Sequence, residues 1–394
     1  MSGQVVFGND YFIRKKDEQK VWRCIKRGGH LILLAPRRAG KTSLLRQLES
    51  SPEKGYVFLY AMVQSCKSEH EFYKQVLEAL YDSDFVSNLS KLQKNAKEFV
   101  ESALEKVEEI KISDSGITLS SSKKEITYKD LAKAIEALNL KQKLIIVLDE
   151  YPDVLEQINK NEGHDAARKF LSNTRWLCQD TKLTSMVQFI FTGSIGLDTL
   201  VSRLNLSNLI NDTDRVTISE LTNIEANEFV EFLVNKHGSP MRMNAKIRAY
   251  LYEKVEWLMP YYIEILWERL EDHCYDHGIT NPQEDDVDAA FEALFSQTYR
   301  SNFNHWVERL SRFDTLERSL AKQVLDELST QGQISFETYF NISQAEKFKD
   351  INGNYVLDCL KHDGYIFAVE PEEVLQFTSP ILKEWWNRYA ERTL

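Results

Sequence analysis

An apolar run that passes through a short loop into a helical pattern is the feature that most constrains the fold of this chain. Residues 30–35, HLILLA, have the near-continuous apolar character of a strand that is buried on both faces. The loop PRRAGKT follows at 36–42, and the helical pattern SLLRQLE occupies 43–49. A strand that turns directly into a helix in this way aims backbone N–H groups and the helix N-terminus at one anion. The stretch therefore predicts a phosphate-binding loop within a parallel α/β sheet.

Each residue type in this loop has an expected task. Gly40 lets the backbone approach a phosphate closely, Lys41 reaches the β- and γ-phosphates of ATP, and the Thr42 hydroxyl ligates Mg²⁺. Arg37 and Arg38 either touch phosphates or an acidic neighbour, or are exposed basic residues. The predicted nucleotide-binding residues of this stretch are Pro36, Arg37, Arg38, Ala39, Gly40, Lys41, Thr42 and Ser43.

The loop departs from the usual pattern at its first position. Ala35 stands where the phosphate-binding pattern G-x-x-x-x-G-K-[ST] begins with glycine. This position mainly serves the turn out of the strand, and Pro36 directly after it fixes its own φ for that turn. Alanine is the least costly replacement provided that its φ stays negative. We therefore expect the loop to keep its function.

Two adjacent carboxylates end a second apolar run, KLIIVLDEYPDVL at 143–155. Asp149 is expected to hold Mg²⁺, and Glu150 to polarise the water that attacks the γ-phosphate, with Lys41 as the other catalytic residue. An ordinary acidic turn after a strand is the alternative. The pairing with the GKT loop favours the catalytic interpretation, and the presence of both acids predicts hydrolysis of ATP.

A further apolar run, VQFIFTG at 187–193, ends in polar residues. In P-loop ATPases that place a strand between the two motif strands, a polar residue here senses the γ-phosphate. Thr192 and Ser194 are the candidates for that role, and ordinary turn polarity is the alternative. Arg203 and Arg215 are both candidates for an arginine that contacts the γ-phosphate, and the sequence does not choose between them.

The order of strand-like and helical patterns indicates an α/β fold followed by two further domains. Residues 1–215 are predicted to form a P-loop NTPase core, a parallel sheet flanked by helices, with an insertion at about 88–127. Residues 216–300 are expected to form a helical lid domain, and 301–394 a winged helix. The strand-like runs are 30–35, 56–63, 143–149 and 187–193, and the helical patterns between them are 41–50, 69–81, 128–138 and 164–179.

Composition excludes several classes of protein. The 394 residues are 43% hydrophobic and carry a formal net charge of −11, which is typical of a globular protein and disfavours nucleic acid and anionic membranes as partners. No apolar run approaches the length of a membrane span, and the first residues lack a signal-peptide pattern. The five cysteines form no C-x-x-C pair, which predicts reduced thiols and a cytoplasmic location.

Segments throughout the chain resemble the archaeal-type P-loop ATPases, which lie near the STAND and AAA+ lineages. The resemblance implies an ATP-binding core, a helical lid and a winged helix whose arrangement depends on the bound nucleotide. It also implies that Phe7, Tyr11 and Phe12 lie near the adenine, with ordinary packing as the alternative. The segment AMVQS departs from the family, because many relatives carry an acidic residue there. The matching segments are FGNDYFIRKKDEQK, PRRAGKTSLL, LIIVLDEYPDVL, FIFTGSIGL, ISELTNIEANEFV, LMPYYIEILWERL, LDCLKHDGYI and FTSPILKEWW.

Local charge separates the expected functions. Residues 301–394 contain ten Lys/Arg and fifteen Asp/Glu, so this domain is predicted to repel a DNA duplex. Residues 14–46 contain eleven Lys/Arg and two Asp/Glu. Some of these basic residues are expected to bind ATP. The others form either a solvated helix face or a docking surface for an acidic partner or protomer. The leading hypothesis is a Mg²⁺-dependent ATPase that acts as a conformational switch for a protein partner or self-association. The alternatives are an ATP-dependent DNA-binding protein of a mobile element or defence system, and a nucleotide-stabilised scaffold.

Overall fold

The computed structural model describes residues 5–83, 101, 112–113, 116–117, 125–193 and 196–393. The chain forms two compact units. The first, the sheet unit, consists of Val6–Leu34 and Lys41–Thr217, and the second, the C-terminal unit, contains Ala35–Gly40 and Ile218–Leu394. The predicted phosphate loop is thus grouped with the C-terminal unit, whereas the helix that follows the loop belongs to the sheet unit. The predicted separation of a lid domain from a winged helix stays a prediction.

A five-stranded parallel sheet forms the centre of the sheet unit, in the order β2-β5-β6-β1-β7. The strands are β1 (His30–Leu34), β2 (Tyr56–Met62), β5 (Lys143–Asp149), β6 (Val187–Thr192) and β7 (Thr213–Thr217). The predicted α/β core is confirmed, and four of its strands coincide with the predicted apolar runs. The sequence did not indicate β7, because TDRVT buries only Val216 and so lacks an apolar run.

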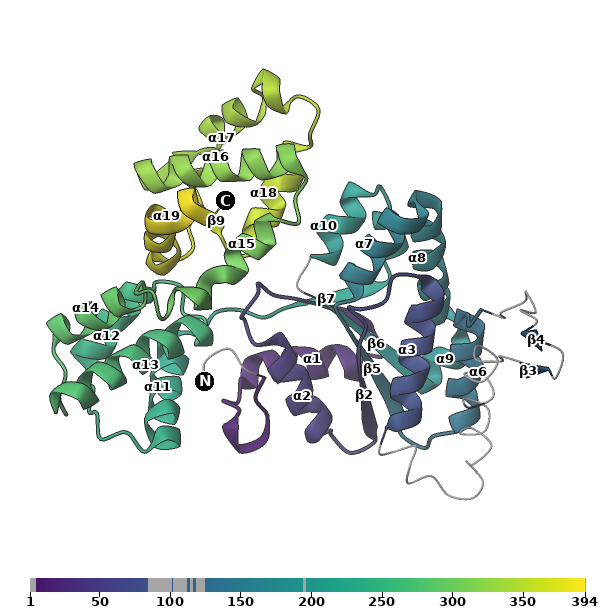
Figure 1. Cartoon of the computed structure of the whole chain (residues 1–394). Helices are drawn as coiled ribbons and strands as arrows, with labels where there is room; N and C mark the ends of the chain where they lie inside the picture. Colours follow the sequence, from purple (N-terminus) through teal and green to yellow (C-terminus); the bar gives the residue numbers. More distant parts are fainter. Residues whose placement is uncertain are drawn as a thin grey trace. The chain divides into compact units, whose positions relative to one another are not determined.

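Helices cover both faces of this sheet, as the right-handed connections of parallel strands require. Figure 1 shows α1 and α2 on one face, and α3, α6, α8 and α9 on the other. On the second face the rings of Phe72 and Phe170 meet edge to face at 5.0 Å, and Tyr151 stacks on Phe170 at 5.2 Å. The helices are α1 (Lys15–Lys26), α2 (Lys41–Ser50), α3 (Glu69–Asp82), α6 (Tyr128–Leu138), α7 (Tyr151–Glu162), α8 (His164–Gln179), α9 (Thr181–Met186), α10 (Leu197–Arg203), and the 3₁₀ turns η1 (Gly8–Asp10) and η3 (Ser207–Leu209).

The C-terminal unit begins with helices, as predicted. The first of them starts at a capping box in which the Glu225 N–H donates to the Thr222 hydroxyl (3.3 Å) and the Thr222 N–H donates to the Glu225 carboxylate (2.8 Å). The helix therefore begins directly after Thr222. The helices of this part are α11 (Asn223–His237), α12 (Ala245–Val255), α13 (Pro260–His277), α14 (Glu284–Ala293), α15 (Asn304–Leu310) and the 3₁₀ turn η4 (Arg300–Phe303).

The remainder of the C-terminal unit has three helices and then two strands and a helix, with a short strand after the first helix. Its strands form an antiparallel sheet in the order β8-β10-β9, and the assignment of 301–394 as a winged helix stays a prediction. A stack of Phe303 and Trp306 (4.9 Å) with Trp385 against it (5.2 Å) joins this part to η4 and α15. The elements are α16 (Thr315–Gln331), β8 (Gln333–Ser335), α17 (Phe336–Ser343), η5 (Glu346–Phe348), α18 (Gly353–His362), β9 (Ile366–Val369), β10 (Val374–Phe377) and α19 (Pro380–Thr393).

The predicted insertion at 88–127 lies almost entirely outside the described residues. Two short antiparallel strands are described there, β3 (Ile112–Ser113) and β4 (Gly116–Ile117). None of the described helices is both long enough and apolar enough to cross a membrane.

Candidate nucleotide-binding site

The carboxyl edge of the parallel sheet brings together the polar residues that the sequence singled out. Asp149 is the last residue of β5, and its register partners are Met62 on β2 and Thr192 on β6. The Thr42 hydroxyl donates a 3.3 Å hydrogen bond to Oδ2 of Asp149, which places the first turn of α2 at this edge. Two motifs that are far apart in the sequence therefore meet side chain to side chain.

The Asp149 carboxylate is buried and receives several donors. Its side chain is 3% exposed, and burial raises its pKa. A hydrogen bond from the Tyr60 hydroxyl opposes this rise of the pKa, as does the charge of Lys41, while the charge of Glu150 adds to it. Oδ1 accepts the backbone N–H of Glu150 at 3.1 Å. Sequence reasoning missed Tyr60, since a tyrosine in an apolar strand carries no signal beyond packing.

Glu150 has an unusual backbone conformation. It directly follows β5 with φ 63° and ψ 31°, in the left-handed region, and is the N-cap residue of α7. For a residue other than glycine this conformation costs on the order of 1–3 kcal/mol and concentrates at functional sites. On the adjacent strand end, a Cβ at Gly193 would lie 3.2 Å from Oε2 of Glu150 and 2.7 Å from Pro152. The Glu150 carboxylate thus lies across the end of β6, in space that glycine leaves open.

The phosphate loop itself has two residues with positive φ, Arg38 at 67° and Gly40 at 86°. Such conformations turn successive N–H groups toward a common point, as anion-binding loops require. The Ala39 N–H closes the turn by donating to the Pro36 carbonyl at 3.3 Å. Ala35 is buried and its φ is not positive, so alanine meets no backbone strain at the first position of the loop.

Both arginines of the loop contact residues of the C-terminal unit, to which the loop belongs. Nη1 of Arg37 lies 3.4 Å from Oε2 of Glu308 on α15, so Arg37 has an acidic neighbour, as one of its two interpretations anticipated. The Arg38 guanidinium lies 4.9 Å from the ring centre of Tyr261 on α13. Burial, and then the charges of these arginines, lower the pKa of His305 to about 3. A neutral His305 therefore tolerates the two cations near it.

The segment that precedes α1 is bound to α2. The Val6 N–H donates to the hydroxyl of Ser43 at 3.2 Å, one residue after Thr42 in the sequence. Tyr11 is buried, Phe12 is half-buried, and Phe7 is 57% exposed. The placement of these aromatic residues near an adenine stays a prediction.

The remaining candidates lie at or beyond the end of β6. Thr192 is buried, and its hydroxyl donates to a β1 carbonyl at 3.3 Å, so it connects two strands. Ser194 lies outside the described residues. Arg215 pairs with Asp198 at 2.7 Å, and Arg203 is the last residue of α10. Their contacts with a γ-phosphate stay predictions.

The donor set suits a magnesium ion. Among the described residues, no group of three or more His, Cys, Asp and Glu side chains could hold a metal alone. Magnesium needs fewer protein ligands beside a nucleotide, because it keeps water and binds phosphate oxygens. The Thr42 hydroxyl and the Asp149 carboxylate are adjacent hard oxygen donors, which is the chemistry that Mg²⁺ prefers.

Comparison with known proteins adds to this geometry. Residues 8–202 match the protein family described as predicted AAA-ATPase, whereas no curated protein matches the chain. The solved structure of a Walker-type ATPase of Pyrococcus abyssi is similar at 15% identity and a TM-score of 0.59, covering 96% of this chain and 96% of that one. The Aeropyrum pernix ORC2 protein, solved with ADPNP and ADP, is 11% identical with a TM-score of 0.50, covering 96% and 93%. At these identities the likeness shows a shared fold.

Proposed function

We propose that the chain is a Mg²⁺-dependent ATPase that acts as a conformational switch, and the match of residues 8–202 to the predicted AAA-ATPase family supports this proposal. The observation that carries the proposal is the meeting of Thr42 with Asp149 at the carboxyl edge of the sheet, with Glu150 next in sequence. Binding alone needs only the loop and the metal ligands. A carboxylate beside them in a constrained conformation supports hydrolysis.

Each residue has a separate role in the proposed reaction. Lys41 binds the β- and γ-phosphate oxygens, and Thr42 with Asp149 holds Mg²⁺, which neutralises phosphate charge when bound. Glu150 orients a water molecule toward the γ-phosphate and accepts a proton from it. The carboxylate of Glu150 lies near Gly193, where the lack of a side chain leaves room for it.

The proposed switch starts in the loop. Glu308 is 64% exposed, so its ion pair with Arg37 is weak in water. Phosphate oxygens in the loop offer Arg37 a doubly charged, bidentate partner, which is the stronger interaction. We therefore propose that ATP draws Arg37 away from Glu308 and changes the contact of the loop with α15. In this way the bound nucleotide changes a contact within the C-terminal unit.

Glu308→Gln is expected to tighten the binding of a fluorescent ATP analogue by up to about fivefold, since an exposed pair contributes at most about 1 kcal/mol. The amide competes less well than the carboxylate for Arg37. Glu346→Gln is the matched control, because Glu346 is 85% exposed in the same unit and pairs with Lys349 instead. Unchanged or weaker binding by Glu308→Gln would contradict this route of coupling.

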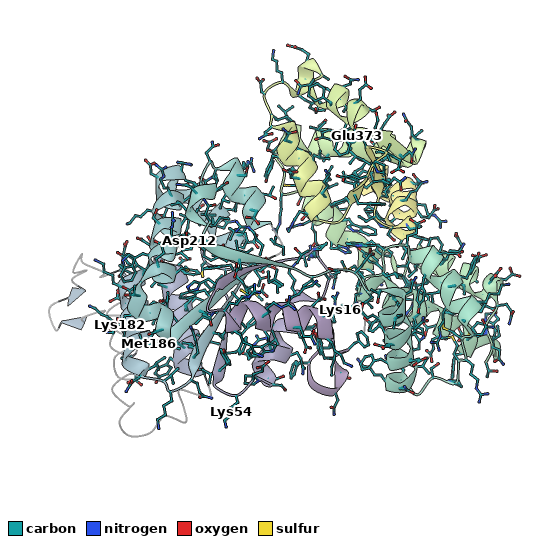
Figure 2. The ribbon with its side chains drawn as sticks, turned by 180° about the vertical axis from the view of Figure 1, so that it is seen from behind. Lys16, Lys54, Lys182, Met186, Asp212 and Glu373 are labelled. Atoms are coloured by element: carbon teal, nitrogen blue, oxygen red, sulfur yellow. The ribbon has the colours of Figure 1, made fainter. Side chains whose placement is uncertain are left out.

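We propose a protein or a second copy of the chain, rather than DNA, as the partner of the C-terminal unit. Glu373 lies in the turn between β9 and β10 (Figure 2), and exposed Glu370 and Glu372 share that turn. Buried Arg309, by contrast, is bound to Asp363 through a 3.0 Å hydrogen bond. The turn EPEE at 370–373 carries three carboxylates and no lysine or arginine, so it repels the phosphate backbone.

A mobility shift assay with duplex DNA tests this choice of partner. We expect no shift at about 150 mM salt, where non-specific contacts are already weakened. A shift that survives this salt concentration would favour the alternative of an ATP-dependent DNA-binding protein.

A further inference from the structure

Tyr60 lies on the strand next to the one that ends in Asp149. It is 7% exposed on β2, where its register partner on β5 is Val147. The guanidinium of Arg46 on α2 lies 3.7 Å from the centre of its ring. Arg46 thus covers one face of the ring, and the Tyr60 hydroxyl donates a hydrogen bond to Oδ2 of Asp149.

The two oxygens of the Asp149 carboxylate have different donors. Oδ1 accepts the Glu150 backbone N–H at 3.1 Å, while Oδ2 accepts both the Tyr60 hydroxyl and the Thr42 hydroxyl. Donors from β2, from α2 and from the following residue therefore fix the plane of the carboxylate. A carboxylate that is held in this way cannot rotate freely when an ion approaches.

The position of the carboxylate matters because of the chemistry of Thr42. A hydroxyl has one proton and two lone pairs, and it can give a lone pair to a metal only if its proton points elsewhere. Oδ2 of Asp149 is the acceptor for that proton in this structure. Groups that hold metal ligands in place commonly contribute about 10- to 100-fold in metal affinity.

We propose that Tyr60 is a positioning residue of the Mg²⁺ site, whose hydroxyl fixes Asp149 so that this carboxylate accepts a hydrogen bond from the Thr42 hydroxyl and leaves a lone pair of the Thr42 oxygen for the ion. This inference rests on the proposed function, because it requires that Thr42 and Asp149 hold Mg²⁺. In this proposal the affinity of the site for Mg²⁺ depends on a residue that lies outside both nucleotide-binding motifs.

Tyr60→Phe tests the inference in the full chain. The ring and its contact with Arg46 remain, and only the hydroxyl is lost. Binding of a fluorescent ADP analogue is titrated with Mg²⁺ and repeated in EDTA. We expect the Mg²⁺ concentration for half of the binding response to rise about tenfold. The affinity in EDTA should stay within about twofold of wild type, because Tyr60 does not hold the nucleotide in this proposal.

Tyr56→Phe is the matched control. Tyr56 lies four residues earlier on the same face of β2, where it packs edge to face on Trp22 at 5.3 Å. Loss of its hydroxyl should leave the Mg²⁺ titration unchanged. A thermal melt of each variant shows whether it folds as the wild type does.

Three outcomes would overturn the inference. The first is a wild-type Mg²⁺ titration in Tyr60→Phe, and the second is an equal shift in Tyr56→Phe. The third is a parallel loss of affinity in EDTA, which would indicate a purely structural role for Tyr60. If the wild type itself binds the nucleotide without any response to Mg²⁺, the proposed function fails as well, so the two failures are distinguishable.

Discussion

Glu150→Gln is expected to slow ATP hydrolysis by about 10²- to 10⁴-fold while nucleotide affinity stays close to that of the wild type. The amide has the size of the carboxylate, but it cannot accept a proton from the attacking water. Glu150 is half-buried at the end of β5 with its backbone in the left-handed region, so the substitution changes the chemistry and leaves the position intact. Phosphate release measured at saturating ATP and Mg²⁺, with binding of a fluorescent ATP analogue in parallel, gives both quantities.

Glu162→Gln is the control for this substitution. Glu162 is exposed at the last position of α7, the helix that Glu150 caps, so the same chemical change there should leave hydrolysis unchanged. Equal activities of wild type and Glu150→Gln would remove Glu150 from the reaction. A wild type with no measurable turnover would instead favour the nucleotide-stabilised scaffold.

Most of the sheet unit could be predicted from the sequence, because parallel strands are buried on both faces. The runs that became β1, β2, β5 and β6 are nearly continuous in apolar residues, and such runs have few alternatives to a buried strand. The edge strand β7 has one buried residue, Val216, so periodicity carried no signal for it. An apolar run thus predicts a buried strand, and it does not predict a strand that is paired but mostly exposed.

The candidate site was predictable only in part, for a related reason. Thr42 and Asp149 belong to patterns with fixed spacing, and parallel strands carry both to one edge of the sheet. Tyr60 belongs to no pattern, because its role depends on where its hydroxyl lies relative to Asp149. Glu308 is far from the loop in sequence, and no local sequence pattern predicts that it pairs with Arg37. Partners of this kind follow from tertiary packing.

Lys41→Ala is expected to weaken the binding of ATP by about 10²-fold or more, because it removes the buried cation that meets the β- and γ-phosphates in the proposed site. Lys41 is 9% exposed at the first position of α2. The loss also leaves the Asp149 carboxylate without this cation, so less positive charge offsets its repulsion of the phosphates. Since the charge of Lys41 lowers the pKa of Asp149, its removal further disfavours the ionised carboxylate that Mg²⁺ requires.

Lys54→Ala separates this effect from a general loss of positive charge. Lys54 is exposed just before β2, at the amino-terminal end of the sheet, and Figure 2 shows it at the outer edge of the sheet unit. Equilibrium binding of a fluorescent ATP analogue should therefore fall in Lys41→Ala alone. Similar affinities in the two variants would mean that the nucleotide is held without Lys41. The phosphate loop would then be an anion site of another kind, because in a P-loop ATPase this lysine contacts the β- and γ-phosphates, between which the bond is broken.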